Sequence, residues 1–207
     1  MKYIHFITVL ICGYSSFAQK EQDFISAYNN HIDPTHQLNT IKILNLKIEL
    51  HAKGIINSTP VNVDNVNECQ YSVGGASKCL DSENGRHVDL NLFPPVKDEF
   101  NNYLKAQLNF ISIKGDSTFF RFKTVNDSIT IIERRINARQ KFVYTFDSKT
   151  INLLQIESNF EKSDTKYSSQ TRFLAYDNVN SILVPKHITF TNNFCTATVI
   201  YSNFSFH

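Results

Sequence analysis

Tryptophan is absent from this 207-residue chain, and methionine, proline and glycine are scarce, with one, five and six residues. The chain ends in alternating polar and apolar residues with Phe206 next to last, a pattern that outer-membrane β-barrels share. So few glycines argue against such a barrel. The sequence also lacks the Gly-x-Ser-x-Gly, His-Glu-x-x-His and phosphate-binding glycine motifs. The usual signatures of a serine hydrolase, a zinc protease and a nucleotide-binding protein are therefore missing.

Charge of either sign is not in excess. The chain has 21 Lys and Arg residues against 19 Asp and Glu residues, so its net charge gives no reason to bind nucleic acid or an anionic membrane. The segment 133–141 is locally basic, which fits a solvated strand and turn, with a phosphate-binding role as the alternative. Beyond the N-terminus, no segment is long and apolar enough for a transmembrane helix.

The N-terminus has the pattern of a secretory signal. Lys2 precedes an apolar run from Ile4 to Cys12, and the small residues Ser16 and Ala18 stand where signal peptidase needs them. We expect cleavage after Ala18; a buried N-terminal strand is the alternative. Lipidation of Cys12 is disfavoured because bulky Ile11 precedes it. The predicted organisation is a signal peptide over 1–18 and a single domain over 19–207.

Three of the four cysteines lie beyond the signal. Export to an oxidising compartment predicts a disulfide between Cys69 and Cys79, since Gly74-Gly75 lets the short segment between them turn back. Cys195 lies in an apolar run and is expected to be a buried thiol. Zinc is disfavoured because the cysteines lack close-spaced pairs, and no cofactor or metal is expected.

Periodicity predicts helices in the first half. Residues 21–31 place Phe24, Ile25 and Tyr28 on one helical face, and Asp33-Pro34 is typical of an N-cap that starts a short second helix. Residues 43–51 alternate as a half-buried strand, with a turn at Lys53-Gly54. We expect an irregular segment over 57–90 with a short strand over 87–92, and then a helix that begins at Pro95.

The second half predicts an antiparallel meander, because short alternating segments are separated by polar turns. The expected fold is α+β: one large curved antiparallel sheet, an incomplete barrel, covered by a few N-terminal and lid helices. The expected strands are 108–113, 118–125, 129–136, 142–146, 151–160, 171–176, 181–184, 188–191 and 197–206.

Aromatic residues are the strongest compositional signal, with 17 Phe and nine Tyr. Many occur at same-face spacing in the predicted strands, so the sheet must bury an aromatic face. That face is either an ordinary core or the wall of an apolar cavity for a lipid or acyl chain. The candidate cavity-lining residues are Phe120, Phe122, Phe142, Tyr144, Phe146, Phe173 and Phe190.

Catalytic residues are not indicated. The histidines beyond the signal are scattered, and His31 and His36 are five residues apart with Pro34 between them, which does not suit a helical metal pair. Glu133 beside Arg134 and Arg135 is expected in a strand ion-pair face. Cys195 lacks the basic neighbours of a reactive thiol.

The segments 23–28 (DFISAY), 38–46 (LNTIKILNL), 142–147 (FVYTFD) and 183–188 (LVPKHI) resemble secreted bacterial proteins of the outer-membrane lipoprotein carrier type, the LolA/LolB-like superfamily. The Ser-Phe-Ala-Gln cleavage region resembles secretory signals of Bacteroidetes-type bacteria. The segment 57–92 has no counterpart in that pattern, and no functional residue of the family can be matched to one position of this chain.

The resemblance implies a periplasmic or outer-membrane-associated protein that is not an enzyme. It would bind a lipid or lipoprotein acyl chain in an apolar cleft, for transfer to or maintenance of the outer membrane, with an outer-membrane acceptor protein as a further partner. Two alternatives remain from the residues: a solid-core envelope module that acts through its surface loops, and a secreted hydrolase.

Overall fold

The computed structural model describes residues 23–37, 40–41, 43–56, 59–72, 78–81, 119–162 and 165–207. A helix covers residues 23–32. Ten strands follow it. They are β1 (Ile43–Ile56), β2 (Thr59–Ser72), β3 (Lys78–Asp81), β4 (Phe119–Val125), β5 (Ile129–Asn137), β6 (Gln140–Asp147), β7 (Leu153–Lys162), β8 (Thr165–Val179), β9 (Ile182–Asn192) and β10 (Cys195–Phe206).

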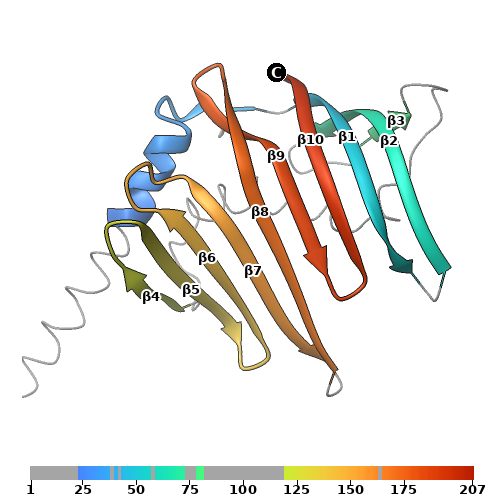
Figure 1. Ribbon diagram of the computed structural model, residues 1–207. Coiled ribbons are helices and arrows are strands. Elements are labelled where there is room, and N and C mark those ends of the chain that lie inside the picture. The colour runs from blue at the N-terminus through green and yellow to red at the C-terminus, as the bar shows by residue number, and fades with distance from the viewer. Residues whose placement is uncertain are drawn as a thin grey trace, which may run out of the picture.

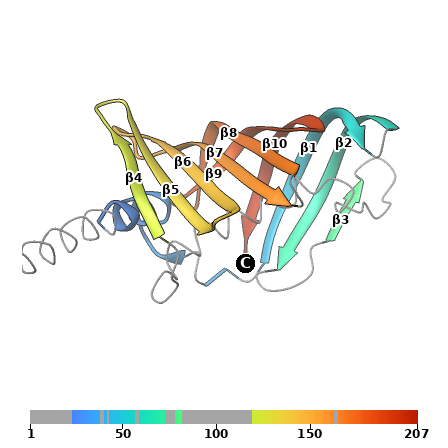
Figure 2. The same ribbon diagram turned by 90° about the horizontal axis from the view of Figure 1, so that it is seen from below.

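All ten strands form one antiparallel sheet in the order β3-β2-β1-β10-β9-β8-β7-β6-β5-β4. The chain is a meander from β4 to β10, and β10 then pairs with β1 (Figure 1). The sheet is curved, and its edge strands β3 and β4 do not pair with each other, so the barrel is unclosed (Figure 2). The predicted α+β fold with a large curved antiparallel sheet is confirmed.

Alternation along the strands decides which face is buried. In β1, Leu44, Leu46, Ile48 and Leu50 are buried, while the residues between them are half-buried. β10 repeats this pattern opposite β1. Since successive side chains of a strand point to opposite faces, one face of the sheet holds the hydrophobic core and the other meets solvent.

The helix over 23–32 lies on the buried face, at the β4–β6 end of the sheet (Figure 2). Tyr28 and Ile32 are buried, and Phe24 and Ile25 pack against the core, as the predicted helical face requires. Asp33 then accepts a hydrogen bond from the Gln37 backbone at 2.9 Å. Asp33 therefore caps a single turn, and Leu38 of the predicted second helix lies outside the described residues.

The predicted turn at Lys53-Gly54 is wrong, because β1 continues through both residues to Ile56. Gly54 instead permits a close approach between strands. A Cβ built there would lie 2.4 Å from the Phe194 carbonyl oxygen. The expectation of an irregular segment over 57–90 is also wrong for 59–72, which form β2 and pair with β1 along its whole length.

The turns of the meander agree with expectation at two points. The Asn126 side chain accepts hydrogen bonds from the Ser128 and Ile129 backbones, and Asp147 accepts from the Lys149 and Thr150 backbones. The predicted four-residue turn over 177–180 is shorter in the structure: β8 runs to Val179.

The β8–β9 turn consists of Asn180 and Ser181, both at positive φ, as in type I′ hairpins. The two short strands expected over 181–184 and 188–191 are one strand, β9, which continues through Pro185. Pro185 is tolerated because β10 pairs only with the stretch of β9 from His187 to Thr191.

Several expectations fall outside the described residues. They are the signal peptide, the strands over 87–92 and 108–113, and the lid helix from Pro95. In the described part of the chain, no helix is long and apolar enough to cross a bilayer.

Candidate functional site

The backbone register places one continuous row of side chains across the inner, helix-bearing face of the sheet. Residues directly opposite each other on antiparallel strands point to the same side, so the pairings can be followed from strand to strand. From β4 to β2, the row is Phe122, Ile132, Tyr144, Ile156, Thr171, Phe190, Ala197, Ala52 and Val63. The row is apolar except for the hydroxyl groups of Tyr144 and Thr171.

The sheet brings six of the seven predicted aromatic residues to this one face. Phe122, Tyr144 and Phe190 belong to the row itself. Phe146 and Phe173 lie two residues further along β6 and β8, and Phe142 lies two residues before Tyr144, so all three share its side of the sheet. Phe120 is opposite Arg134 in the β4–β5 register, and its side chain lies outside the described residues.

The helix covers part of this aromatic set. The ring centroid of Phe24 lies 5.8 Å from Phe122 and 5.1 Å from Phe146, and that of Tyr28 lies 5.0 Å from Phe146, all edge to face. Burial, with the neighbouring Tyr144, raises the pKa of Tyr28. Phe122 and Phe146 therefore form the core beneath the helix.

Small residues interrupt the row on the other side of Phe190. Ala197 of β10 is opposite both Phe190 of β9 and Ala52 of β1. Both alanines are buried, and their methyl groups rise less from the sheet than the large side chains on either side. We call this stretch of small side chains between Phe190 and Val63, two strands wide, the alanine trough.

A buried amide lies on the same inner face, four residues along β2 from Val63, and the sequence did not predict it. Asn67 of β2 is opposite Ile48 of β1, and its side chain is fully buried. Neither its Oδ1 nor its Nδ2 has a hydrogen-bond partner among the described residues. The only sequence signal was its spacing of two residues from the buried Cys69.

The basic segment over 133–141 is divided between the two faces. The Glu133 carboxylate is nearly buried on the outer face, with Lys123 at 3.7 Å, Arg135 at 3.5 Å and Lys141 at 3.9 Å. The expected ion-pair face is therefore present, although Arg134 points to the opposite, inner face by alternation. The segment does not form a single basic patch.

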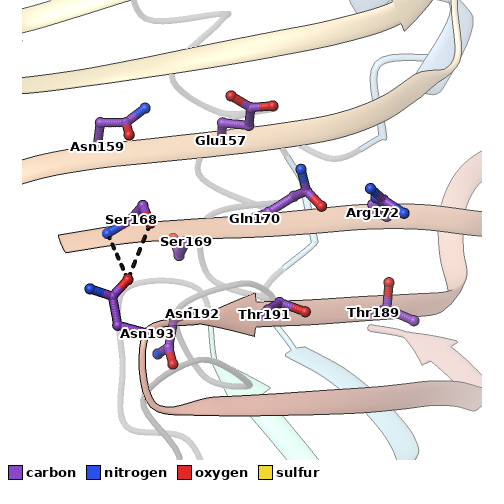
Figure 3. Close-up of a pocket in the computed structure, with 10 residues that line it drawn as sticks. All are labelled: Glu157, Asn159, Ser168, Ser169, Gln170, Arg172, Thr189, Thr191, Asn192 and Asn193. Carbon is purple, nitrogen blue, oxygen red and sulfur yellow. Dashed lines mark hydrogen bonds between the residues drawn. The ribbon is translucent and has the colours of Figure 1, made fainter.

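The outer face has a polar hollow of about 500 Å³ over β7, β8 and β9 (Figure 3). Arg172 donates to Gln155 at 3.3 Å, and Gln155 donates to Glu157 at 2.6 Å. A row of amide, hydroxyl and charged groups does not suit an acyl chain, because each polar group would lose its hydrogen bonds to water beneath the apolar chain. The inner face is therefore the candidate site for an apolar ligand.

Metal and nucleophile chemistry have no support in the described residues, where no three His, Cys, Asp or Glu residues are grouped as metal ligands. Burial raises the pKa of the Cys195 thiol, which disfavours the reactive thiolate. Cys69 is buried and stands opposite Cys79 in the β2–β3 register, and the predicted disulfide between them remains a prediction.

Comparison with known proteins gives likeness in structure alone. No family model matches the chain, and no curated protein matches it. Among solved structures, a LolA superfamily protein from Nitrosomonas europaea has a TM-score of 0.49 at 10% identity, covering 90% of this chain and 93% of its own. An outer membrane lipoprotein-sorting protein domain from Vibrio parahaemolyticus has a TM-score of 0.48 at 9% identity, covering 88% and 91%.

A DUF1329 family protein from Desulfovibrio piger has a TM-score of 0.46 at 9% identity, covering 88% of this chain and 92% of its own. The structural neighbours thus include proteins of the superfamily that the sequence resembles.

Proposed function

We propose that this chain is an exported, non-enzymatic protein of the bacterial cell envelope that binds a lipid or lipoprotein acyl chain on the inner face of its sheet. The bound chain would be transferred to, or would help maintain, the outer membrane, with an outer-membrane acceptor as a further partner. The observation that supports this most is the broad apolar inner face of an unclosed sheet. In the described part of the chain, one helix lies on this face, at the β4–β6 end alone.

The energetics favour an acyl ligand. Each methylene that leaves water contributes about 0.8 kcal/mol, so about ten methylenes contribute about 8 kcal/mol before the cost of association. A long, mostly apolar surface suits such a ligand, since an acyl chain needs no hydrogen bonds from the protein. The specificity would then come from length and shape.

The proposed contact residues are those of the seven that the helix does not cover. Phe173 on β8 and Phe190 on β9 lie nearer the alanine trough than the β4–β6 end does, and Phe142 lies on β6 toward the β5–β6 hairpin. The bound chain would contact the other four residues only if it reached β4. These are Phe122, Tyr144 and Phe146, which belong to the helix-covered end, and Phe120 at the edge. Ala52 and Ala197 join the proposed site as its floor.

Export and oxidation belong to the same proposal. We infer cleavage after Ala18, a mature domain over 19–207 in the periplasm, and a disulfide between Cys69 and Cys79. Residues opposite each other on antiparallel strands have Cα atoms about 4.5–5.5 Å apart, within the range that a disulfide spans. The bond would fasten the short edge strand β3 to β2.

Native mass spectrometry of the chain, expressed with its own signal and purified from a bacterial periplasm without detergent, tests the proposal. We expect a protein mass that begins at Gln19 and a stoichiometric lipid or acylated peptide that is lost on unfolding. A ligand-free protein that also takes up no added fatty acid or lipopeptide would overturn the carrier function. That result would favour the envelope module that acts through its surface.

A substitution that fills the alanine trough with a larger side chain distinguishes a ligand-binding site from a closed core. Ala197→Leu places a larger apolar side chain in the trough, where it would compete with an acyl chain and lower the lipid load while the fold persists. In a closed core, the same change costs about 1–3 kcal/mol by overpacking and leaves the lipid load unchanged. Thr198→Leu, one residue further on the outer face of β10, is the matched control.

A further inference from the structure

Four hairpins turn at the same end of the sheet: β1–β2, β5–β6, β7–β8 and β9–β10. In Figure 1, the strand ends that these hairpins join lie at the lower end of the sheet, while the helix and the C-terminus lie toward its upper end. Side chains near these turns are distant in sequence but share one end of the molecule. The alanine trough begins near this end, since Ala52 and Ala197 lie two residues from Gly54 and Cys195.

Three exposed aromatic rings stand next to one another at this end, and we call them the aromatic rim: Phe160, Tyr167 and Phe194. Their exposed fractions are 38%, 36% and 54%. The ring centroid of Tyr167 lies 5.9 Å from Phe160 and 6.3 Å from Phe194. Adjacent large apolar groups in water are unusual unless they meet a partner.

Hydrogen bonds hold the rim in place. The Asn193 side chain accepts from the Ser168 backbone and hydroxyl and donates to the Lys166 carbonyl, which joins the β9–β10 turn to β8. The Asn192 side chain accepts from the Phe194 and Cys195 backbones. The Phe194 carbonyl accepts from Ile55, another exposed apolar residue. The exposure of the rings therefore belongs to a fixed arrangement of three strands.

The same end concentrates positive charge, although the whole chain is nearly neutral. The hairpin segments 52–63, 133–141, 158–168 and 190–197 contain seven Lys or Arg residues and three Asp or Glu residues, which leaves 14 and 16 in the rest of the chain. Among these cations, Arg139 and Lys53 are exposed, and Lys166 is exposed opposite Glu161. Among the described residues, cations are therefore in excess at the end that carries the aromatic rim.

We propose that the aromatic rim docks on the surface of a lipid bilayer that contains anionic headgroups. Aromatic side chains favour the headgroup level of a bilayer, and nearby cations are attracted to anionic lipid. The two features act together here because the rings and cations come from the same set of hairpins. This surface docking does not depend on whether an acyl chain binds inside the sheet.

The absence of tryptophan from the chain makes a direct test available. Phe194→Trp introduces one indole at the rim, and its emission should shift to the blue when vesicles of phosphatidylethanolamine and phosphatidylglycerol are added to the purified protein. Leu174→Trp is the control, because Leu174 is 55% exposed on β8 but distant from the rim. Its emission should remain unchanged.

Co-flotation with the same vesicles measures affinity. Phe160→Ser with Tyr167→Ser should weaken binding at least tenfold, since two apolar contacts are lost. Arg139→Glu and Lys166→Glu should each weaken it about fivefold or more, and added salt should reduce the difference. Leu174→Ser and Lys149→Glu, at sites away from the rim, should bind as the unchanged chain does.

Several results would each overturn the proposal, and three of them come from single comparisons. They are no binding to anionic vesicles, equal blue shifts of the Phe194→Trp and Leu174→Trp variants, and unchanged binding of the variant that carries both Phe160→Ser and Tyr167→Ser. Circular dichroism of each variant keeps these results interpretable, because exposed residues should be replaced without loss of fold. An equal loss of vesicle binding at the rim and at the control sites would likewise exclude a specific docking surface.

Discussion

Gly54 of β1 and Cys195 of β10 are register partners whose strands approach unusually closely. A Cβ built on Gly54 would lie 2.5 Å from the Cys195 Cβ and 2.7 Å from its Cα. The approach joins the end of β1 to the β9–β10 turn, from which Phe194 extends. Gly54 therefore permits the close approach of β1 and β10, the first and last strands along the chain.

Gly54→Ala should destabilise the protein by about 1–3 kcal/mol, because the new methyl group would contact backbone atoms that cannot rotate away. Urea unfolding followed by circular dichroism measures the change. Lys53→Ala, at the exposed neighbouring position, should alter stability by less than about 0.5 kcal/mol. Equal stability of the Gly54→Ala variant and the parent would contradict the close approach.

The proposed disulfide predicts thiol counts. The denatured, unreduced mature chain should contain one reactive thiol, that of Cys195. After reduction it should contain three. Cys195→Ser should abolish the reaction before reduction, and Cys69→Ser should leave two thiols. Replacing Cys69 and Cys79 together by alanine should lower the free energy of unfolding by about 2–3 kcal/mol. Three reactive thiols in the unreduced protein would disprove the bond.

Much of the fold follows from the alternation of side chains. The meander from β4 to β10 and the helix over 23–32 have strong apolar periods. Counting along the strands also places six of the seven candidate aromatic residues, all but Phe120, on one face. β2 was missed because its inward positions include Asn65 and Asn67, so polar residues hide the period of two. Gly54 was misread because a glycine for a turn and a glycine for close approach look alike in sequence.

The candidate sites were less accessible to sequence reasoning. The pair of Ala52 and Ala197 joins strands about 145 positions apart in sequence, and only the register of a folded sheet shows that they touch the same trough. Likewise, the near-neutral net charge gave no reason to expect a membrane surface. Charge at one end of the molecule depends on which hairpins turn there, and composition contains no such information.

His51 should titrate above the ordinary histidine pKa of about 6.5. The hydrogen bond with Glu49 is the main cause, assisted by the Asp64 carboxylate, and both contacts are 2.9 Å long. Because the folded pKa is raised, the stabilising contribution is complete below the unfolded pKa and is lost as pH rises through the folded value.

An NMR titration of the His51 ring measures that pKa directly. Glu49→Gln should lower it more than Asp64→Asn does, because the Glu49 hydrogen bond has the larger effect. His51→Gln identifies the resonance. A midpoint at or below about 6.5 in the parent protein would show that the two carboxylates do not hold the imidazolium.

Asn67→Val should stabilise the protein by about 1–2 kcal/mol, because the change removes a buried amide that has no hydrogen-bond partner among the described residues. Valine also suits a strand position opposite Ile48. Urea unfolding checks the stability, and Asn62→Val, at an exposed position of the same strand, is the control. A loss of stability would show that the amide is hydrogen-bonded in solution. If the inner face binds an acyl chain through apolar contact alone, the lipid load of the Asn67→Val protein should equal that of the parent, whereas a reduced load would assign the amide to the polar end of the ligand.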